Sequence, residues 1–273
     1  MIEVVTAGVD WLSATLVRGA VMDQLWVERC LRLLDAVVAD GHKLEYRSWN
    51  GYSGVGAGGC FVGEREDGHY AQFSGVYADT AFEKIYRYDM HVSRLDIQVT
   101  VKYKNMPKRV AKEAYRDAMA ENASISSSRR RKIYIIVGSD GGDTCYVGSP
   151  SSDERGRIYN KEVQSEDIHF MRTWRWEVVL KNDKATDCAS RISQVTTNRI
   201  SWLSDFCGHW WEKRGVSVPW LLAEAPVPVR PVRTIPTDVE RKRNWLAHQV
   251  RPTVEYLLTL YDKEDILLLL GLS

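Results

Sequence analysis

The chain has 273 residues, of which 44% are hydrophobic and 27% are charged, which is typical of a globular protein with a sizeable core. Its formal net charge is only +1, so any binding of DNA requires basic residues that are concentrated locally. Five scattered cysteines without a CxxC spacing exclude the usual zinc and disulfide frameworks and favour the cytoplasm. No secretion signal and no apolar run of membrane-spanning length is recognised, so no membrane partner is expected.

The first part of the chain is predicted to mix strands and helices. Apolar residues recur at helical spacing before Gly41, and a series of glycines divides the following stretch into short strands. The predicted elements are a strand at 2–17, a helix at 22–39, a meander of strands at 44–73, a helix at 79–88, a strand at 93–101 and a helix at 107–120.

The second part repeats this alternation after a polar, basic connection. Strands are predicted at 132–138, 143–148, 155–161 and 171–181, and helices at 183–193 and 195–213. Short hairpin connections and one-faced alternation favour antiparallel pairing. The sequence therefore predicts an α+β fold, in which two similar sheet-plus-helix halves, about 1–122 and 123–220, form a shared charged sheet surface.

The character of the sequence changes after residue 220. Four prolines within residues 221–236 predict a semi-rigid linker. Thr237 and Glu240 have the spacing of a capping box, which predicts the start of a small helical segment over residues 237–273. Arg241 and Arg243 make the beginning of this segment basic.

Three predicted strands carry an arginine two residues before an acid or a tyrosine. Since side chains alternate along a strand, the members of each pair lie on one face. For one such strand, a solvent-exposed face with salt bridges is a sufficient explanation. Three such strands make it equally reasonable that they form a shared surface, which could bind phosphate or hold a metal ion against phosphate. The pairs are Arg94 and Asp96, Arg157 and Tyr159 (followed by Lys161), and Arg175 and Glu177.

These motifs, in this order, resemble the replication initiation factor (Rep_trans) family. The family includes rolling-circle initiators of plasmids and filamentous phages, and related relaxases of conjugative elements. The resemblance extends from about residue 8 to about residue 190. It rests on Arg94-Leu95-Asp96, on Tyr146-Val147-Gly148-Ser149 with Arg157-Ile158-Tyr159-Asn160-Lys161, and on Trp174-Arg175-Trp176-Glu177 with Leu180-Lys181.

The resemblance implies a nicking enzyme with Tyr159 as its nucleophile. In that reaction the tyrosine attacks one DNA strand at an origin, which forms a 5′-phosphotyrosine and a free 3′-OH, and a later reversal rejoins strands. Arg157 and Lys161 would lower the pKa of the phenol or stabilise the charge on the phosphate. The implied nicking and DNA-binding domain covers residues 1–220, and the implied partners are origin DNA and the helicase and DNA polymerase of a bacterial host, with a homodimer left open.

A metal ion, if one binds, must use oxygen ligands, because no pair of neighbouring histidines is present. Oxygen ligands favour Mg²⁺ or Mn²⁺. Asp96 and Glu177 are the best candidates and Asp10 is the third. Family members often have a second acid at the position of Thr100, and this chain departs from that pattern.

Several basic residues are expected to contact DNA phosphates. Arg94 and Arg175 belong to the shared face, and the strongest charge run lies just before the second set of strands. Two alternatives stay open: a conjugative relaxase with the same chemistry, and a non-catalytic DNA-binding regulator that keeps the fold. The charge run is Arg129, Arg130, Arg131 and Lys132, and Arg241 and Arg243 of the C-terminal segment complete the predicted DNA-binding set.

Overall fold

The computed structural model describes residues 2–20, 23–87, 89–104, 109–139, 141–165, 170–221, 254 and 256–258. Residues 1–226 form one compact unit and residues 227–273 form a second. The predicted linker and C-terminal helical segment lie almost entirely outside the described residues, so both stay predictions. All that follows concerns the first unit.

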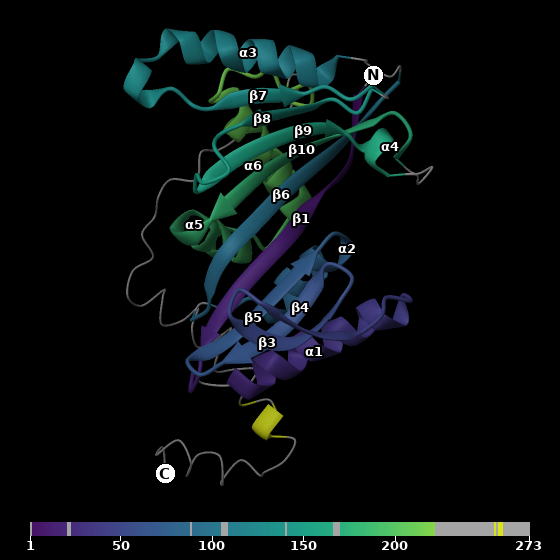
Figure 1. The fold of residues 1–273 in the computed structure, drawn as a ribbon, viewed down its shortest axis with the longest axis vertical. Coiled ribbons are helices and arrows are strands. Elements are labelled where there is room, and N and C mark those ends of the chain that lie inside the picture. Colours follow the sequence, from purple (N-terminus) through teal and green to yellow (C-terminus); the bar gives the residue numbers. More distant parts are fainter. Residues whose placement is uncertain are drawn as a thin grey trace. The chain divides into compact units, whose positions relative to one another are not determined.

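Ten strands form a single antiparallel sheet in the order β2-β3-β4-β5-β1-β6-β10-β9-β8-β7 (Figure 1). The two long central strands pair with each other, and each half of the chain extends the sheet outward from them. The strands are β1 Ile2–Val17, β2 Glu45–Trp49, β3 Tyr52–Ala57, β4 Cys60–Arg65, β5 Gly68–Ser74, β6 His91–Tyr103, β7 Ile133–Ile136, β8 Thr144–Val147, β9 Glu154–Asn160 and β10 Thr173–Lys181.

The predicted helices are confirmed, with shifts of a few residues at their ends. In addition, the chain turns directly from β9 into a short helix that the sequence analysis did not predict, and only its first residue, Lys161, was assigned to the preceding strand. The helices are α1 Asp23–Ala39, α2 Val76–Ile85, α3 Val110–Ser124, α4 Lys161–Gln164, α5 Asn182–Ser193 and α6 Arg199–Glu212, with a 3₁₀ turn at Ser127–Arg129.

The strand order contains one pattern twice. Each half starts with a central strand, continues through a helix and a meander of four strands, and ends with a helix. The first half runs from β1 to α2 and the second from β6 to α5. These topological halves meet between Ile85 and His91, whereas the sequence analysis divided the chain near residue 122, because in the strand order β6 and α3 open the second repeat.

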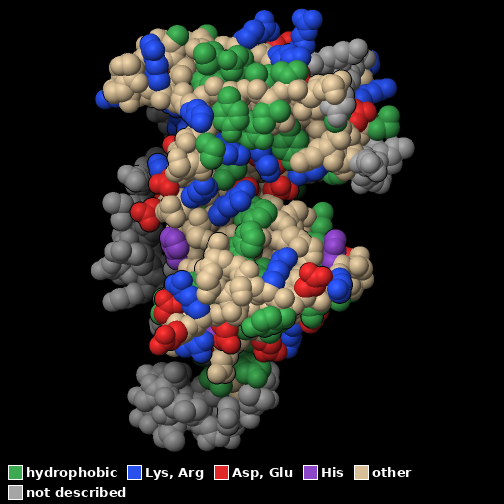
Figure 2. All heavy atoms as spheres, viewed as in Figure 1, with side chains coloured by type: hydrophobic (Ala, Val, Ile, Leu, Met, Phe, Trp, Pro, Cys, Tyr) green, Lys and Arg blue, Asp and Glu red, His purple; other side chains and the backbone are tan. Residues whose placement is uncertain are grey.

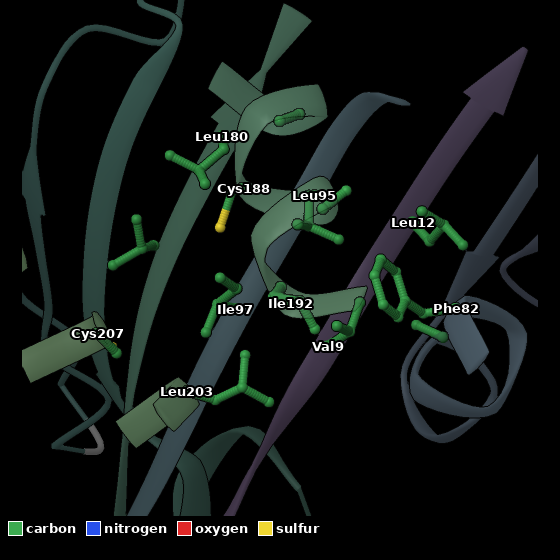
Figure 3. Close-up of a cluster of buried hydrophobic side chains, with 14 of the residues drawn as sticks. Val9, Leu12, Phe82, Leu95, Ile97, Leu180, Cys188, Ile192, Leu203 and Cys207 are labelled. Atoms are coloured by element: carbon green, nitrogen blue, oxygen red, sulfur yellow. The ribbon is translucent and has the colours of Figure 1, made fainter. Parts of the chain in front are cut away.

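One face of the sheet carries the hydrophobic core. Helices α1 and α2 pack against the strands of the first half, and α3, α5 and α6 against those of the second. Leu95 and Ile97 of β6 meet Ile192 of α5 and Leu203 of α6 in this layer (Figure 3). Most of the buried apolar residues of the strands contribute to this core, and the opposite face carries the polar residues and a small separate cluster of Tyr52, Phe61 and Tyr70.

Gly156 of β9 allows α6 to approach the sheet closely. A Cβ atom built at this glycine would lie 2.4 Å from the ring of Trp210 and 2.5 Å from the ring of Trp211. Since a buried side chain of any size would displace these rings, the two indoles occupy the space above a bare backbone.

Among the described residues, no helix is long and apolar enough to cross a membrane.

Candidate active site

The three motifs with an arginine two residues from an acid or a tyrosine lie on adjacent strands. Arg157 of β9 is opposite Glu177 of β10, and Tyr159 is opposite Arg175. Glu177 is in turn opposite Gln98 of β6, two residues from Asp96. Because residues opposite each other in an antiparallel pair project from the same face, the prediction of a common face is confirmed.

Tyr159 is held by the acid of the neighbouring strand. Its hydroxyl donates a hydrogen bond of 2.6 Å to Glu177 Oε1. Arg157 Nε donates to the other carboxylate oxygen, Oε2. The guanidinium of Arg157 also lies 5.3 Å from the centre of the Tyr159 ring. Phenol, carboxylate and guanidinium thus form one hydrogen-bonded cluster, with Glu177 fully buried.

Asp96 forms a second ion pair on this face. Arg94 Nε and Nη2 donate to the two oxygens of Asp96 at 2.9 and 2.7 Å. Trp11 of β1 lies opposite Asp96 in the register, and its ring packs 4.3 Å from the Arg94 guanidinium. The indole and the arginine shield the carboxylate, which is only 1% exposed.

Asp10 joins the same face through an irregularity in β1. The pairing of β1 with β6 shifts between Val9 and Trp11, which is a bulge at Asp10. Asp10 Oδ1 accepts a hydrogen bond of 2.9 Å from Arg175 Nη1. Arg175 Nε donates to Thr100 Oγ1 at 3.0 Å, and this hydroxyl donates to Gln98 Oε1 at 2.8 Å. At the position where relatives often have a second acid, Thr100 therefore orients Arg175.

The predicted metal ligands are each engaged by a different arginine. Asp10 contacts Arg175, Asp96 contacts Arg94, and Glu177 contacts Arg157. In the part of the chain that the structure describes, no three His, Cys, Asp or Glu side chains are grouped as a metal site. A bound Mg²⁺ or Mn²⁺ would therefore have to displace these arginines from the carboxylates, and a metal requirement stays a prediction.

Lys161 lies near Tyr159 but is placed differently from the prediction. It is the first residue of α4, so it does not extend the alternation of β9. The Asn160 side chain caps α4 by accepting from the backbone amides of Glu162 and Val163, which turns the chain out of the sheet. Lys161 Nζ still lies 5.9 Å from the Tyr159 ring centre. Asn160 followed by helix-forming residues was the sequence signal for this turn.

Burial shifts the pKa values of the phenol and of two of its neighbours, Glu177 and Lys161. Burial and the Glu177 charge raise the pKa of Tyr159 above its ordinary value of 10.0. Burial also raises the pKa of the Glu177 carboxyl above 4.5. Burial and the charge of Arg175 lower the pKa of Lys161 from 10.5. The cluster therefore keeps the phenol protonated at neutral pH while it makes Glu177 a better base and Lys161 a better acid.

Basic side chains gather across the middle of the face in Figure 2. Two of the predicted DNA contacts, Arg94 and Arg175, form ion pairs with Asp96 and Asp10 on the polar face of the sheet. Arg129 and Arg130 are exposed in the connection before β7. The side chain of Asn122 holds this connection, because its oxygen accepts from the Arg131 amide and its nitrogen donates to the Arg131 carbonyl. Arg241 and Arg243 lie outside the described residues. The contacts of all these residues with DNA stay predictions.

The hydroxyl of Thr100 is expected to stabilise the network beneath the site. Thr100→Val keeps the volume but leaves Arg175 Nε without its acceptor and Gln98 Oε1 without its donor, so the free energy of unfolding should fall by about 1–3 kcal/mol. Urea unfolding monitored by tryptophan fluorescence measures this change. Thr144→Val is the matched control, because the Thr144 hydroxyl is half-buried on the same face and no hydrogen bond to it is found within the described residues. Equal losses in both variants would contradict the assigned role.

Comparison with known proteins identifies the family. Among solved structures, the chain is similar to the rolling circle replication initiator protein from Geobacillus stearothermophilus, with a TM-score of 0.55 and 21% sequence identity over 79% of this chain and 86% of that chain. This likeness supports the α+β fold. No curated protein matches the sequence. The model of the family described as replication initiation factor matches residues 90–269, well over half of the chain, and the protein therefore belongs to that family.

Proposed function

We propose that this replication initiation factor nicks one strand of origin DNA by transesterification, as a rolling-circle initiator, with Tyr159 as the nucleophile. The observation that carries the proposal is the hydrogen bond from the Tyr159 hydroxyl to buried Glu177, beside two arginines. A phenol in contact with a base and next to cations is the arrangement that attack on a phosphodiester requires. Family membership supplies the replication context.

Glu177 acts as the general base in this proposal. As the phenolic oxygen attacks phosphorus, the proton moves along the existing 2.6 Å hydrogen bond to Glu177 Oε1. The new bond joins Tyr159 to the 5′ phosphate, and the bond between phosphorus and the 3′ oxygen breaks. The energy of the broken phosphodiester bond is conserved in the covalent intermediate, so the rejoining reaction needs no nucleotide cofactor.

Arg157 and Lys161 serve the phosphate and the departing oxygen. Both side chains lie within 6 Å of the Tyr159 ring centre, at 5.3 and 5.9 Å. Arg157 is suited to hold the negative charge that grows on the phosphoryl oxygens. Lys161, whose pKa is lowered, is suited to give a proton to the 3′ oxygen as it leaves.

Tyr159→Phe tests the nucleophile directly. The change removes one oxygen and keeps the ring, so folding and DNA binding should persist while nicking and the covalent adduct disappear. A supercoiled plasmid that carries the cognate origin, analysed on denaturing gels with and without Mn²⁺ or EDTA, measures the nick, the adduct and the predicted metal requirement. Tyr146→Phe is the control, because Tyr146 lies on the adjacent strand of the same face, opposite Arg157, and should keep nicking. If the Tyr159→Phe protein still forms a covalent adduct, another residue is the nucleophile. If the wild-type protein binds the origin but never nicks it, the non-catalytic regulator is favoured.

The rate of nicking should first rise and then fall as the pH increases. It should rise as Glu177 loses its proton, at a pH above the ordinary carboxyl pKa of 4.5, because only the ionised form accepts the phenolic proton. It should fall as Lys161 loses its proton, at a pH below the ordinary lysine pKa of 10.5. Single-turnover rates of wild type, Glu177→Gln and Lys161→Gln check this, with circular dichroism as the folding control. If Glu177→Gln keeps the rising limb, another group is the base.

The connection before β7 should contribute to the affinity for DNA through phosphates. Replacing Arg129, Arg130 and Arg131 with Gln should reduce the slope of log K against log salt concentration by roughly one unit for each contact that is lost. Fluorescence anisotropy at several salt concentrations measures the slope. The matched control replaces Arg29, Arg32 and Lys84, which are exposed on α1 and α2. An unchanged slope in the first variant would remove this connection from the interface.

A further inference from the structure

Two tyrosines continue the polar face from the candidate active site to the edge of the sheet. Tyr134 of β7 is opposite Tyr146 of β8, and Tyr146 is opposite Arg157 of β9. All three side chains therefore project from the face that carries Tyr159. Since adjacent strands lie about 4.8 Å apart, the outer tyrosine is about 10 Å from Arg157 across the sheet.

The two rings form a stacked pair with a cation over each. Their centres are 4.7 Å apart and their planes differ by 15°. The Arg155 guanidinium lies 4.8 Å from the Tyr146 ring centre, and Lys132 Nζ lies 5.8 Å from the Tyr134 ring centre. Both tyrosines are only half-buried, and no hydrogen bond to either hydroxyl is found among the described residues.

These features match the requirements of a surface for single-stranded DNA. Such surfaces combine aromatic rings that stack on bases with cations that follow the phosphates, and they tolerate many sequences. Lys132 and the exposed Arg130 supply positive charge at the outer end of the row, and Arg155 and Arg157 supply it toward Tyr159.

We propose that Tyr134 and Tyr146, with Arg155 and Lys132, bind bases of single-stranded DNA adjacent to the phosphate that Tyr159 attacks. The inference rests on the proposed function, because it takes Tyr159 as the position of the scissile phosphate. A separation of about 10 Å corresponds to the one or two nucleotides next to that phosphate, so the row would hold the unpaired strand in line with the nucleophile.

Binding of a thymidine 16-mer, compared with an abasic 16-mer of the same backbone, tests the proposal without any cleavage. The two oligonucleotides carry equal charge, so the ratio of their dissociation constants isolates the contribution of the bases. Stacking contributes about 1–3 kcal/mol per base, so we expect the wild type to prefer the thymidine oligonucleotide roughly 5- to 150-fold. Replacing both tyrosines with Leu should bring this ratio close to one and leave the affinity for the abasic backbone unchanged.

Two further variants exclude a merely structural role. Replacing both tyrosines with Phe keeps the rings and should keep the ratio. Tyr46→Leu changes an exposed tyrosine on β2, the opposite edge strand, and should have no effect. A ratio that stays at the wild-type value in the Leu variant, or a wild type without preference for bases, overturns the proposal. Since this assay requires no nicking, a failure here leaves the role of Tyr159 to its own test.

Discussion

The pairing of buried charges across the central strands is the constraint on which this structure depends. Glu177 is 0% exposed and Asp96 is 1% exposed. A buried carboxylate without a partner costs several kcal/mol, so each needs a cation at a fixed position. A slip of β9 by one residue against β10 would move Arg157 to the core face and leave Glu177 unpaired. The ion pairs and the apolar alternation therefore select the same register, and that register places Tyr159 against Glu177.

The two halves of the sheet share a topology but differ in what their polar faces carry. In the second half this face holds the ion pairs and Tyr159. In the first half the equivalent meander holds an aromatic cluster of Tyr52, Phe61 and Tyr70, with the Arg65 guanidinium 4.5 Å from the Tyr52 ring centre. Tyr70 donates to Ser13 on the adjacent central strand β1, whereas the central strand of the second half, β6, carries Asp96 on this face. The repeated fold thus provides the frame, and only one copy has acquired the groups for the proposed chemistry.

The sequence predicted those parts of the site that follow from alternation. Arg94, Asp96 and Glu177 lie in regular strands, so their common face could be deduced from spacing of two. Asp10 could not be placed in this way, because strict alternation puts it on the core face with Leu12, and only the bulge after Val9 turns it toward Arg175. The pairing of each acid with its own arginine depends on rotamers and on neighbouring strands, which no single stretch of sequence encodes. The repeat boundary was missed for a similar reason, since the match between the halves lies in strand order and not in residues.

The burial of Tyr159 has a consequence for how the proposed reaction would begin. The residue is 6% exposed, its hydroxyl is already bound to Glu177, and Arg157 and Lys161 are the cations beside its ring. Arg157 now neutralises Glu177. When its guanidinium turns to the incoming phosphate, Glu177 loses part of its counter-charge and its affinity for a proton rises, since an isolated buried carboxylate favours the neutral form. Binding of the substrate would then itself activate the base. The raised pKa of the phenol fits this order of events, because in it Tyr159 would stay protonated until a phosphate displaced Arg157 from its carboxylate.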